Sequence, residues 1–454
     1  MSTIRELPPV PGIPPGPPPS ALPGIVRDLA TDRLTLMSSA AHNYGDAVRI
    51  RVGPKTLYFL DHPDHAKHVL AENPDNYHKG IGLVQARRAL GDGLLTSDGD
   101  LWRGQRALVS PTFGHKRVAE ASDVIADEAA RLVSGLWQHR GHSAVDVVPR
   151  LTELTLGVLG RALLDVDRDL IGSVGPEFET VQDQAMFEMV SMNSVPNWLP
   201  LPRNVRFRRA RARLRRIVDD IVARRSLTPL DRDDLLARLI GSTNAEPDPA
   251  VGTRRMRDEV ITLLLAGHET TASTLSWTLY LLDRHPWAAQ RVHDEVVAVL
   301  GRRPPSYEDL HRLRYTTMVL QESMRLYPPV WILPRVAVGE DVIGGYRIPA
   351  GSDVLVSPYT LHRHPAFWDE PDLFRPERFD PDLARARARY AYIPFGAGPR
   401  FCVGNNLGMV EATFALALIC RDLRLSVEPG HPVVPEPMLS LRIRGGLPVR
   451  VESW

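Results

Sequence analysis

The stretch Phe395-Gly396-Ala397-Gly398-Pro399-Arg400-Phe401-Cys402-Val403-Gly404 decides how the rest of this chain is interpreted. Three glycines and a proline around one cysteine predict a tight loop, and the apolar segment 407–420 that follows is typical of a helix. Small residues let a flat cofactor approach the backbone, and a thiolate can ligate iron. Backbone amides and the N-terminus of the following helix can stabilise the negative charge on sulfur. These residues indicate a metal-thiolate site, with a buried cysteine in a glycine-rich turn as an equally weighted alternative.

The composition is that of an ordinary folded enzyme, and it directs attention to sites rather than to bulk charge. The chain has 454 residues, of which 43% are hydrophobic, and 55 Lys and Arg residues against 54 Asp and Glu give a formal net charge of +1. This balance excludes disorder and fibrous repeats. It offers no bulk electrostatic reason to bind nucleic acid, because phosphate backbones reward concentrated positive charge.

The number of cysteines and the length of the apolar stretches indicate the cellular compartment of the protein. Cys402 and Cys420 are too few for a disulfide scaffold, and Cys420, inside an apolar run, is expected to be ordinary core. The longest apolar stretches, 260–267 and 415–420, fall short of the roughly 18 residues that a membrane span needs. The N-terminus has no secretory-signal pattern. We therefore expect no membrane span and a cytoplasmic location.

The remaining pattern predicts one mostly helical domain with small β-sheets near its beginning and end. Nine prolines within 8–23 predict an extended leader over 1–24, lying on the surface of a domain over 25–454. Alternating apolar and charged residues over 46–60 predict a β-hairpin that turns at Gly53-Pro54. Helical periodicity dominates 63–300, and further β-rich patches are expected at 335–356 and after Leu423.

Three segments carry a clear helical period of 3.6 residues, namely 123–137, 151–164 and 208–225. The last belongs to a stretch with ten arginines, 203–225. Its apolar members recur near helical spacing, which predicts an amphipathic helix with a solvated arginine face rather than a nucleic-acid or membrane-surface helix. The residues expected to form its buried stripe are Phe207, Leu214, Val218 and Ile221.

The cysteine loop brings a family resemblance into view. The ten residues 395–404 match the whole heme-binding signature of the cytochrome P-450 family, and four further landmarks occur in the order of that family. They are Trp102-Arg103-Gly104-Gln105-Arg106, Ala266-Gly267-His268-Glu269-Thr270-Thr271, Glu322-Ser323-Met324-Arg325 and Phe374-Arg375-Pro376-Glu377-Arg378-Phe379. Such a joint match is very specific, and it covers the chain from the first hairpin to the C-terminus.

The resemblance implies a mainly α fold with small β-sheets (α+β), in which heme b lies between the oxygen-binding helix and the cysteine loop. Cys402 would be the axial thiolate ligand. Glu322, Arg325 and Arg378 would form the structural triad of the family, although on sequence alone a Glu-x-x-Arg is more often a solvated surface pair. The implied cofactor-binding residues are Trp102, Arg106, Arg335 and Arg400 at the heme propionates, with Phe395, Gly396 and Gly404 in the loop.

The segment 266–271 is expected to carry the chemistry. A glycine in the middle of an apolar helix costs about 1 kcal/mol relative to alanine, and in the resembled family the helix opens here to leave a groove for dioxygen. Glu269 and Thr270 then take the places of the acid and alcohol that relay protons, with Thr270 stabilising bound oxygen and Glu269 connecting it to solvent. The implied reaction inserts one oxygen atom of O2 into a substrate C–H bond.

The implied substrate is a hydrophobic small molecule, namely a terpenoid, polyketide or fatty acyl compound, held chiefly by shape. The side chains expected to line its pocket are Leu265, Ala266, Val330, Trp331, Ile332 and Leu439. A further wall over 186–201 would contribute Met186, Met189, Met192 and Trp198, although a methionine stripe is more often core packing.

Electrons are expected to come from separate proteins, a ferredoxin and its reductase, because no dinucleotide-binding motif follows the cysteine loop. Arg385, Arg387 and Arg389 could line the docking face, or form a solvated segment. Two alternatives to the monooxygenase remain. One is a peroxygenase or an isomerase on the same fold, in which the acid and alcohol pair is commonly altered. The other is a non-catalytic heme-binding sensor.

Overall fold

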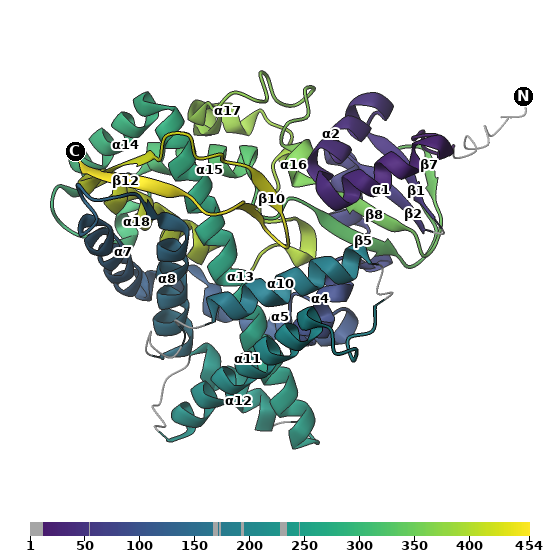
Figure 1. Ribbon diagram of the computed structural model, residues 1–454, viewed down its shortest axis with the longest axis horizontal. Coiled ribbons are helices and arrows are strands. Elements are labelled where there is room, and N and C mark those ends of the chain that lie inside the picture. Colours follow the sequence, from purple (N-terminus) through teal and green to yellow (C-terminus); the bar gives the residue numbers. More distant parts are fainter. Residues whose placement is uncertain are drawn as a thin grey trace, which may run out of the picture. The chain divides into compact units, whose positions relative to one another are not determined.

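The computed structural model describes residues 12–454 apart from 54, 167–170, 172–173, 192–194, 228–233 and 245. Its chain divides into two compact units, each built from several separate segments. The first comprises the described residues through Ile81 together with Ile332–Pro371 and Arg387–Phe401, and the second comprises Gly82–Trp331, Asp372–Ala386 and Cys402–Trp454. Figure 1 labels most of their helices and strands. The single domain over 25–454 remains a prediction.

The first unit is built around a five-stranded mixed sheet with the strand order β1-β2-β8-β5-β3. The strands of this unit are β1 (Ala47–Val52), β2 (Lys55–Leu60), β3 (Tyr77–Lys79), β5 (Leu333–Ala337), β6 (Asp341–Ile343), β7 (Tyr346–Ile348) and β8 (Asp353–Val356). β1 and β2 form the predicted hairpin around Gly53, and β2 runs parallel to β8. β6 and β7 pair separately. The predicted β-rich patch over 335–356 is therefore confirmed.

Short helices accompany this sheet. They are η1 (Pro19–Ala21), α1 (Leu22–Thr31), α2 (Arg33–Tyr44), α3 (Pro63–Lys67), η2 (His68–Glu72), η3 (Pro74–Asn76), α16 (Pro358–Leu361), η8 (Arg389–Ala391) and η9 (Gly398–Arg400). The core beneath them gathers Tyr58, Leu60, Val69 and Tyr77, all buried, with Val354 from the central strand.

The described part of the leader lies on the first unit. The Arg347 amide donates to the Gly12 carbonyl and the Arg49 amide donates to the Pro15 carbonyl, at 2.9 and 2.8 Å. The prediction of an extended leader through residue 24 is wrong at its end, because α1 begins at Leu22. Pro23 stands in its first turn, where a missing amide breaks no helical hydrogen bond. Residues 1–11 of the predicted leader lie outside the described residues.

The second unit is mainly helical. Its helices are α4 (Leu83–Leu90), α5 (Gly99–Val109), η4 (Ser110–Phe113), α6 (His115–Glu120), α7 (Ser122–Trp137), α8 (Val147–Leu159), η5 (Gly160–Leu164), α10 (Gly175–Val190), α11 (Pro202–Leu227), α12 (Leu235–Asn244), α13 (Pro249–Arg284), α14 (Pro286–Leu300), η6 (Tyr307–Asp309), α15 (Arg314–Leu326), η7 (Pro376–Phe379), α17 (Pro381–Arg385) and α18 (Asn405–Asp422). Its strands are β4 (Val145–Asp146), β9 (Leu423–Val427), β10 (Pro435–Pro437), β11 (Leu441–Ile443) and β12 (Pro448–Ser453). They form the sheets β4-β12-β9 and β10-β11.

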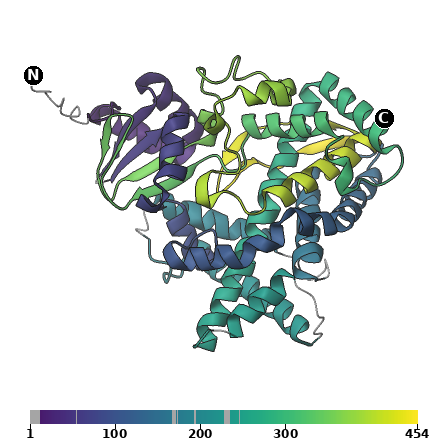
Figure 2. The same cartoon turned by 180° about the vertical axis from the view of Figure 1, so that it is seen from behind.

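The helix α13, 36 residues long, is the central support of this unit. It contacts α8, α11, α12, α15 and α18, which surround it in both views of Figures 1 and 2. Two of its buried hydroxyls are satisfied within the helix, since Thr274 and Thr278 each donate to the carbonyl four residues earlier. Trp277 stacks on Tyr327, the residue that follows α15, with ring centroids 3.9 Å apart, so an aromatic contact also holds α13 near the end of α15.

The predicted helices correspond to α7, to α8 with the π-helical turn η5, and to α11. In α11 the four residues of the expected apolar stripe are at most 3% exposed, while most of its arginines face outward. The mainly α architecture with small β-sheets is confirmed. Within the part of the chain that the structure describes, no helix has a stretch long and apolar enough to cross a membrane.

Candidate active site

Cys402 lies on the short link between η9 and α18, just before the helix begins at Asn405. Its sulfur accepts hydrogen bonds from the backbone amides of Gly404 and Asn405. Burial raises the pKa of the Cys402 thiol, and these amides together with the Arg106 guanidinium oppose the rise. The residue as a whole nevertheless keeps exposed surface. A sulfur that already accepts two amide hydrogen bonds is suited to bind a metal as thiolate.

Arg106 and Trp102 lie one turn apart on α5. Burial lowers the pKa of Arg106, while the Cys402 thiolate acts in the opposite direction. The second unit therefore holds a thiolate donor within electrostatic reach of a partly buried arginine. This donor set fits a heme, because the sulfur suits the iron and a guanidinium suits a propionate carboxylate.

The part of the cysteine loop before Cys402 belongs to the first unit. Gly396 has a left-handed φ of +72°, and its amide donates to the Ile393 carbonyl at 3.0 Å to close a turn. Gly398 also has a positive φ, and a Cβ there would lie 1.9 Å from the Leu70 carbonyl oxygen. Only glycine allows the loop to approach η2 this closely. The motif contains Gly398, but the sequence alone does not reveal the contact that requires it.

The other predicted cofactor residues of the first unit have the following surroundings. The Phe395 ring lies 6.3 Å from that of Phe401. Arg335 in β5 is 7% exposed and donates from Nη1 to the Pro334 carbonyl at 2.9 Å. Arg400 ends η9 and is partly buried. The roles at the propionates remain predictions for these two arginines.

Glu322 and Arg325 form a fully buried ion pair on α15. The guanidinium donates from Nε and Nη2 to the two carboxylate oxygens at 2.7 and 2.8 Å, and both side chains are 0% exposed. Arg325 also donates to the Leu373 carbonyl, and the Arg375 amide donates to Glu322. Arg378 Nε lies 3.5 Å from Glu322 Oε1. The three predicted triad residues therefore lie together, and they attach the segment 373–378 to α15.

Glu269 and Thr270 lie side by side in the sequence of α13 but contact different groups. Glu269 accepts from Gln182 Nε2 of α10 at 2.6 Å and from Ser440 Oγ at 2.8 Å. Burial raises the pKa of the Glu269 carboxyl, and the hydrogen bonds and Arg442 oppose the rise. Thr270 Oγ1 donates to the Ala266 carbonyl at 2.8 Å. The sequence offers no signal for Gln182 or Ser440, which are single polar residues in mixed surroundings.

Gly267 has a packing role that differs from the expected one. α13 runs as an unbroken α-helix through Gly267, so the expected opening of the helix is not present. A Cβ at this position would lie 2.7 and 2.8 Å from the two δ-carbons of Leu159 on α8. The close approach of α8 to α13 therefore requires the small residue.

Two of the segments that contain predicted pocket residues, 329–331 and the β10–β11 hairpin, are joined by hydrogen bonds. Trp331 Nε1 donates to the Met438 carbonyl at 2.8 Å, and the Leu441 amide donates to the Pro329 carbonyl at 2.8 Å. Ala266, Val330 and Leu439 keep partial exposure, whereas Leu265 and Trp331 are 3% and 4% exposed and present little surface to a ligand. Ile332 begins a segment of the first unit.

The methionine wall is only partly described. Met186 is 7% exposed, which agrees with core packing, and Trp198 is 75% exposed. Met192 and the side chain of Met189 lie outside the described residues.

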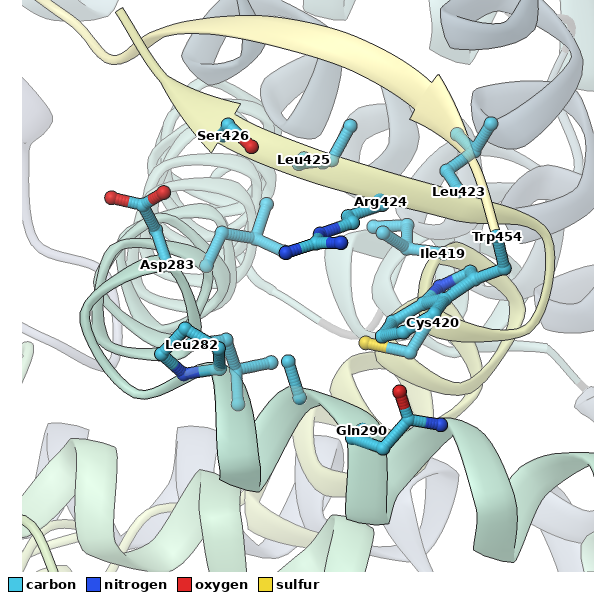
Figure 3. A pocket seen from close by; sticks show the side chains of 13 residues that line it. Leu282, Asp283, Gln290, Ile419, Cys420, Leu423, Arg424, Leu425, Ser426 and Trp454 are labelled. Carbon is cyan, nitrogen blue, oxygen red and sulfur yellow. The ribbon is translucent and has the colours of Figure 1, made fainter. Parts of the chain in front are cut away.

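A separate pocket of about 140 Å³ lies between α13, α14, α18 and β9. Arg424 and the indole of Trp454 line it, together with Cys420 (Figure 3). It contains none of the predicted site residues. Cys420 is buried here as part of the core, as predicted from its apolar run.

Comparison with known proteins gives a consistent result. The family model described as Cytochrome P450 matches residues 14–447. A cyclooctatin synthase from Streptomyces melanosporofaciens is 38% identical over 89% of this chain and 88% of that protein. A cyclooctat-9-en-7-ol 5-monooxygenase from the same organism is 36% identical over 87% and 85% of the two chains. A pentalenene oxygenase from Streptomyces avermitilis is 34% identical over 88% and 89%.

The fold is also similar to that of a solved structure. The crystal structure of the cytochrome P450DA heme domain matches with a TM-score of 0.86 and 26% sequence identity, over 98% of each chain.

Proposed function

Because this chain belongs to the cytochrome P450 family of heme-thiolate monooxygenases, we propose that it inserts one oxygen atom of O2 into a cyclic terpenoid. Cys402 holds the heme iron, and Glu269 and Thr270 serve the proton route. One observation carries the proposal. The second unit combines Cys402, whose sulfur accepts two hydrogen bonds from backbone amides, with the acid Glu269 and the alcohol Thr270 on α13.

The residues of the second unit have separable tasks. Bound heme supplies dioxygen activation, which a cysteine ligand promotes by donating electron density. The amides of Gly404 and Asn405 favour the thiolate form of Cys402, and Arg106 adds positive charge near it. The Thr270 hydroxyl donates its proton in a hydrogen bond to the Ala266 carbonyl, so its oxygen can still accept a further hydrogen bond. Glu269, whose carboxyl pKa is raised by burial, is placed to take up and release a proton.

A cyclic terpenoid fits the residues and the relatives. The predicted pocket residues are all apolar, and those of the second unit that keep exposed surface are Ala266, Val330 and Leu439. Such a lining binds a hydrocarbon skeleton by shape, without a charged anchor. Two relatives are named for pentalenene and for cyclooctat-9-en-7-ol, which are substrates of this kind. These names favour a terpenoid over a polyketide or fatty acyl compound.

Electrons reach the site from a ferredoxin and its reductase in this proposal. Arg385 and Arg389 are exposed near the cysteine loop in sequence, and the Arg387 guanidinium lies 4.3 Å from the centre of the Trp368 ring. Such cations suit an acidic partner. Reversing all three charges should slow reduction by ferredoxin, and an unchanged rate would contradict this docking face.

The first test is the reduced carbon monoxide difference spectrum of the purified protein. A strongly red-shifted Soret band that disappears in Cys402→Ser would support the thiolate ligand. Oxygen consumption with cyclic terpenoids then tests the substrate class, with formation of a hydroxylated product as the positive result.

Thr270→Ala separates the monooxygenase from its alternatives. The substitution should divert consumed oxygen into hydrogen peroxide, because a hydroxyl of the proton route is lost. Peroxide-driven product formation that is insensitive to Thr270→Ala would favour a peroxygenase, and efficient reduction without turnover of any ligand would favour a sensor.

A further inference from the structure

The hydrogen-bond partners of Glu269 are both neutral groups that can donate and accept. Gln182 supplies an amide and Ser440 a hydroxyl, and each side chain is 2% exposed. A hydroxyl carries one donor and two lone pairs, and a primary amide carries two donors and a carbonyl acceptor. Either group can therefore bond to a carboxylate or to a carboxylic acid.

Two buried carboxylates of the second unit, those of Glu322 and Asp309, are instead held by cations. Glu322 is bonded by two guanidinium nitrogens of Arg325, at 2.7 and 2.8 Å. Asp309 is bonded by two guanidinium nitrogens of Arg303, at 2.5 and 2.6 Å, which holds the pKa of Asp309 well below its usual range. A fixed cation has no acceptor to offer a protonated acid, so these partners lock the carboxylate form. The partners of Glu269 do not.

The Gln182 amide has an unused acceptor. Its Oε1 is buried, and no hydrogen-bond donor of the described chain reaches it. When Glu269 is ionised, the amide must present Nε2 to it. When Glu269 carries a proton, a half-turn of the amide would present Oε1 instead and satisfy both groups.

Charged groups lie near Glu269, Gln182 and Ser440, and some of these charged groups are exposed at the surface. Arg442, two residues beyond Ser440, favours the ionised form of Glu269, and Glu179 of α10 opposes it. Arg442 is itself paired with Glu436 at 2.8 Å and lies 4.0 Å from Asp183, whose side chain is 59% exposed. His268, next to Glu269, stays neutral because burial lowers its pKa to about 4.

We propose that Gln182 and Ser440 are positioning residues that let Glu269 take up and release a proton. The Ser440 hydroxyl passes its proton to Glu269 and takes up another from a hydronium ion supplied by the solvent, while the Gln182 amide turns to follow the protonation state. This inference rests on the proposed function, in which Glu269 serves the proton route.

The test is infrared spectroscopy of the heme-loaded protein during a pH titration. The C=O stretching band of protonated Glu269 is identified by its loss in Glu269→Gln. Ser440→Ala and Gln182→Met each remove one hydrogen bond, so the band should move to higher wavenumber. The midpoint of the titration should rise by about half a unit to one unit, because a carboxylate gains more from a hydrogen bond than an acid does.

Two control variants make the test specific. Ser440→Thr keeps the hydroxyl and should retain the wild-type band and midpoint. Ser276→Ala deletes a buried hydroxyl of α13 that donates within the helix to the Ala272 carbonyl at 2.7 Å, and it should leave the Glu269 band unchanged. The same variants are then assayed for peroxide released per oxygen consumed, which should rise several-fold in Ser440→Ala and Gln182→Met only.

The outcomes distinguish this inference from the proposed function. A wild-type protein that oxidises no terpenoid but shows the infrared shifts would contradict the substrate proposal and support the arrangement around Glu269. A wild-type protein that turns over normally, with unchanged band, midpoint and coupling in Ser440→Ala and Gln182→Met, would overturn the inference.

Discussion

Removing the guanidinium of the buried pair on α15 should be among the most destabilising single changes in the second unit. In Arg325→Met, Glu322 loses both charge-assisted hydrogen bonds, and the Leu373 carbonyl loses a donor. Both side chains of the pair are fully buried, so water cannot replace the lost partner. Breaking a buried pair from one side costs about 3–5 kcal/mol. Since folded proteins are stable by about 5–15 kcal/mol, this is a large share of the total.

The assay is urea unfolding of the heme-loaded protein, followed by far-ultraviolet circular dichroism. Arg150→Met is the matched control, because Arg150 pairs with Glu153 at the same spacing on a helix but with both side chains 43% exposed. Exposed pairs contribute about 0–1 kcal/mol, so the control should unfold near the wild-type midpoint. If Arg325→Met cost no more free energy of unfolding than Arg150→Met, the assignment of a buried locking role would be refuted.

Three further changes test other contacts. Gly267→Ala should lower the free energy of unfolding by about 1–2 kcal/mol in the same assay, because overpacking against Leu159 outweighs the gain in helix propensity. Gly398→Ala, which would place a Cβ against the Leu70 carbonyl at a positive φ, should lower heme retention measured by Soret absorbance. Burial raises the pKa of Asp61 to about 7, so the folded state keeps a proton that the unfolded chain loses near 3.8, and stability falls as pH rises between these values. Relative to wild type, Asp61→Asn should therefore gain free energy of unfolding as pH rises from 5 to 7, by up to about 1.4 kcal/mol per pH unit, measured by urea unfolding at each pH.

The sequence predicts what depends on neighbours along the chain. The hairpin at 46–60 and the buried stripe of α11 follow from local alternation and helical period, and both are found in the structure. The cysteine loop and the Glu322–Arg325 spacing are likewise contiguous patterns, which is why they could be matched to a family before any fold was known.

Contacts between distant segments could not be predicted in this way. Gln182 and Ser440 stand 87 and 171 positions from Glu269, and nothing in their own surroundings marks them as its partners. Gly267 was correctly singled out as costly for a helix, but its reason, the Leu159 side chain of α8, lies in another element. The prediction failed there because a glycine is expected both where a helix opens and where two helices pack closely, and the sequence alone does not distinguish these two cases.

In the proposed function, the hairpin β10–β11 links the predicted substrate pocket to the proton route. Ser273 and Trp277 of α13 both donate to the Leu441 carbonyl, at 2.6 and 2.9 Å, which fixes the hairpin on the helix. Its turn places Ser440 on Glu269 and carries Leu439, a predicted pocket residue, as the preceding position. Leu439 and Ser440 share a peptide bond, so a substrate that displaces the backbone at Leu439 should also shift the Ser440 hydroxyl. In this proposal, the choice of substrate and the delivery of protons depend on the same few residues of backbone.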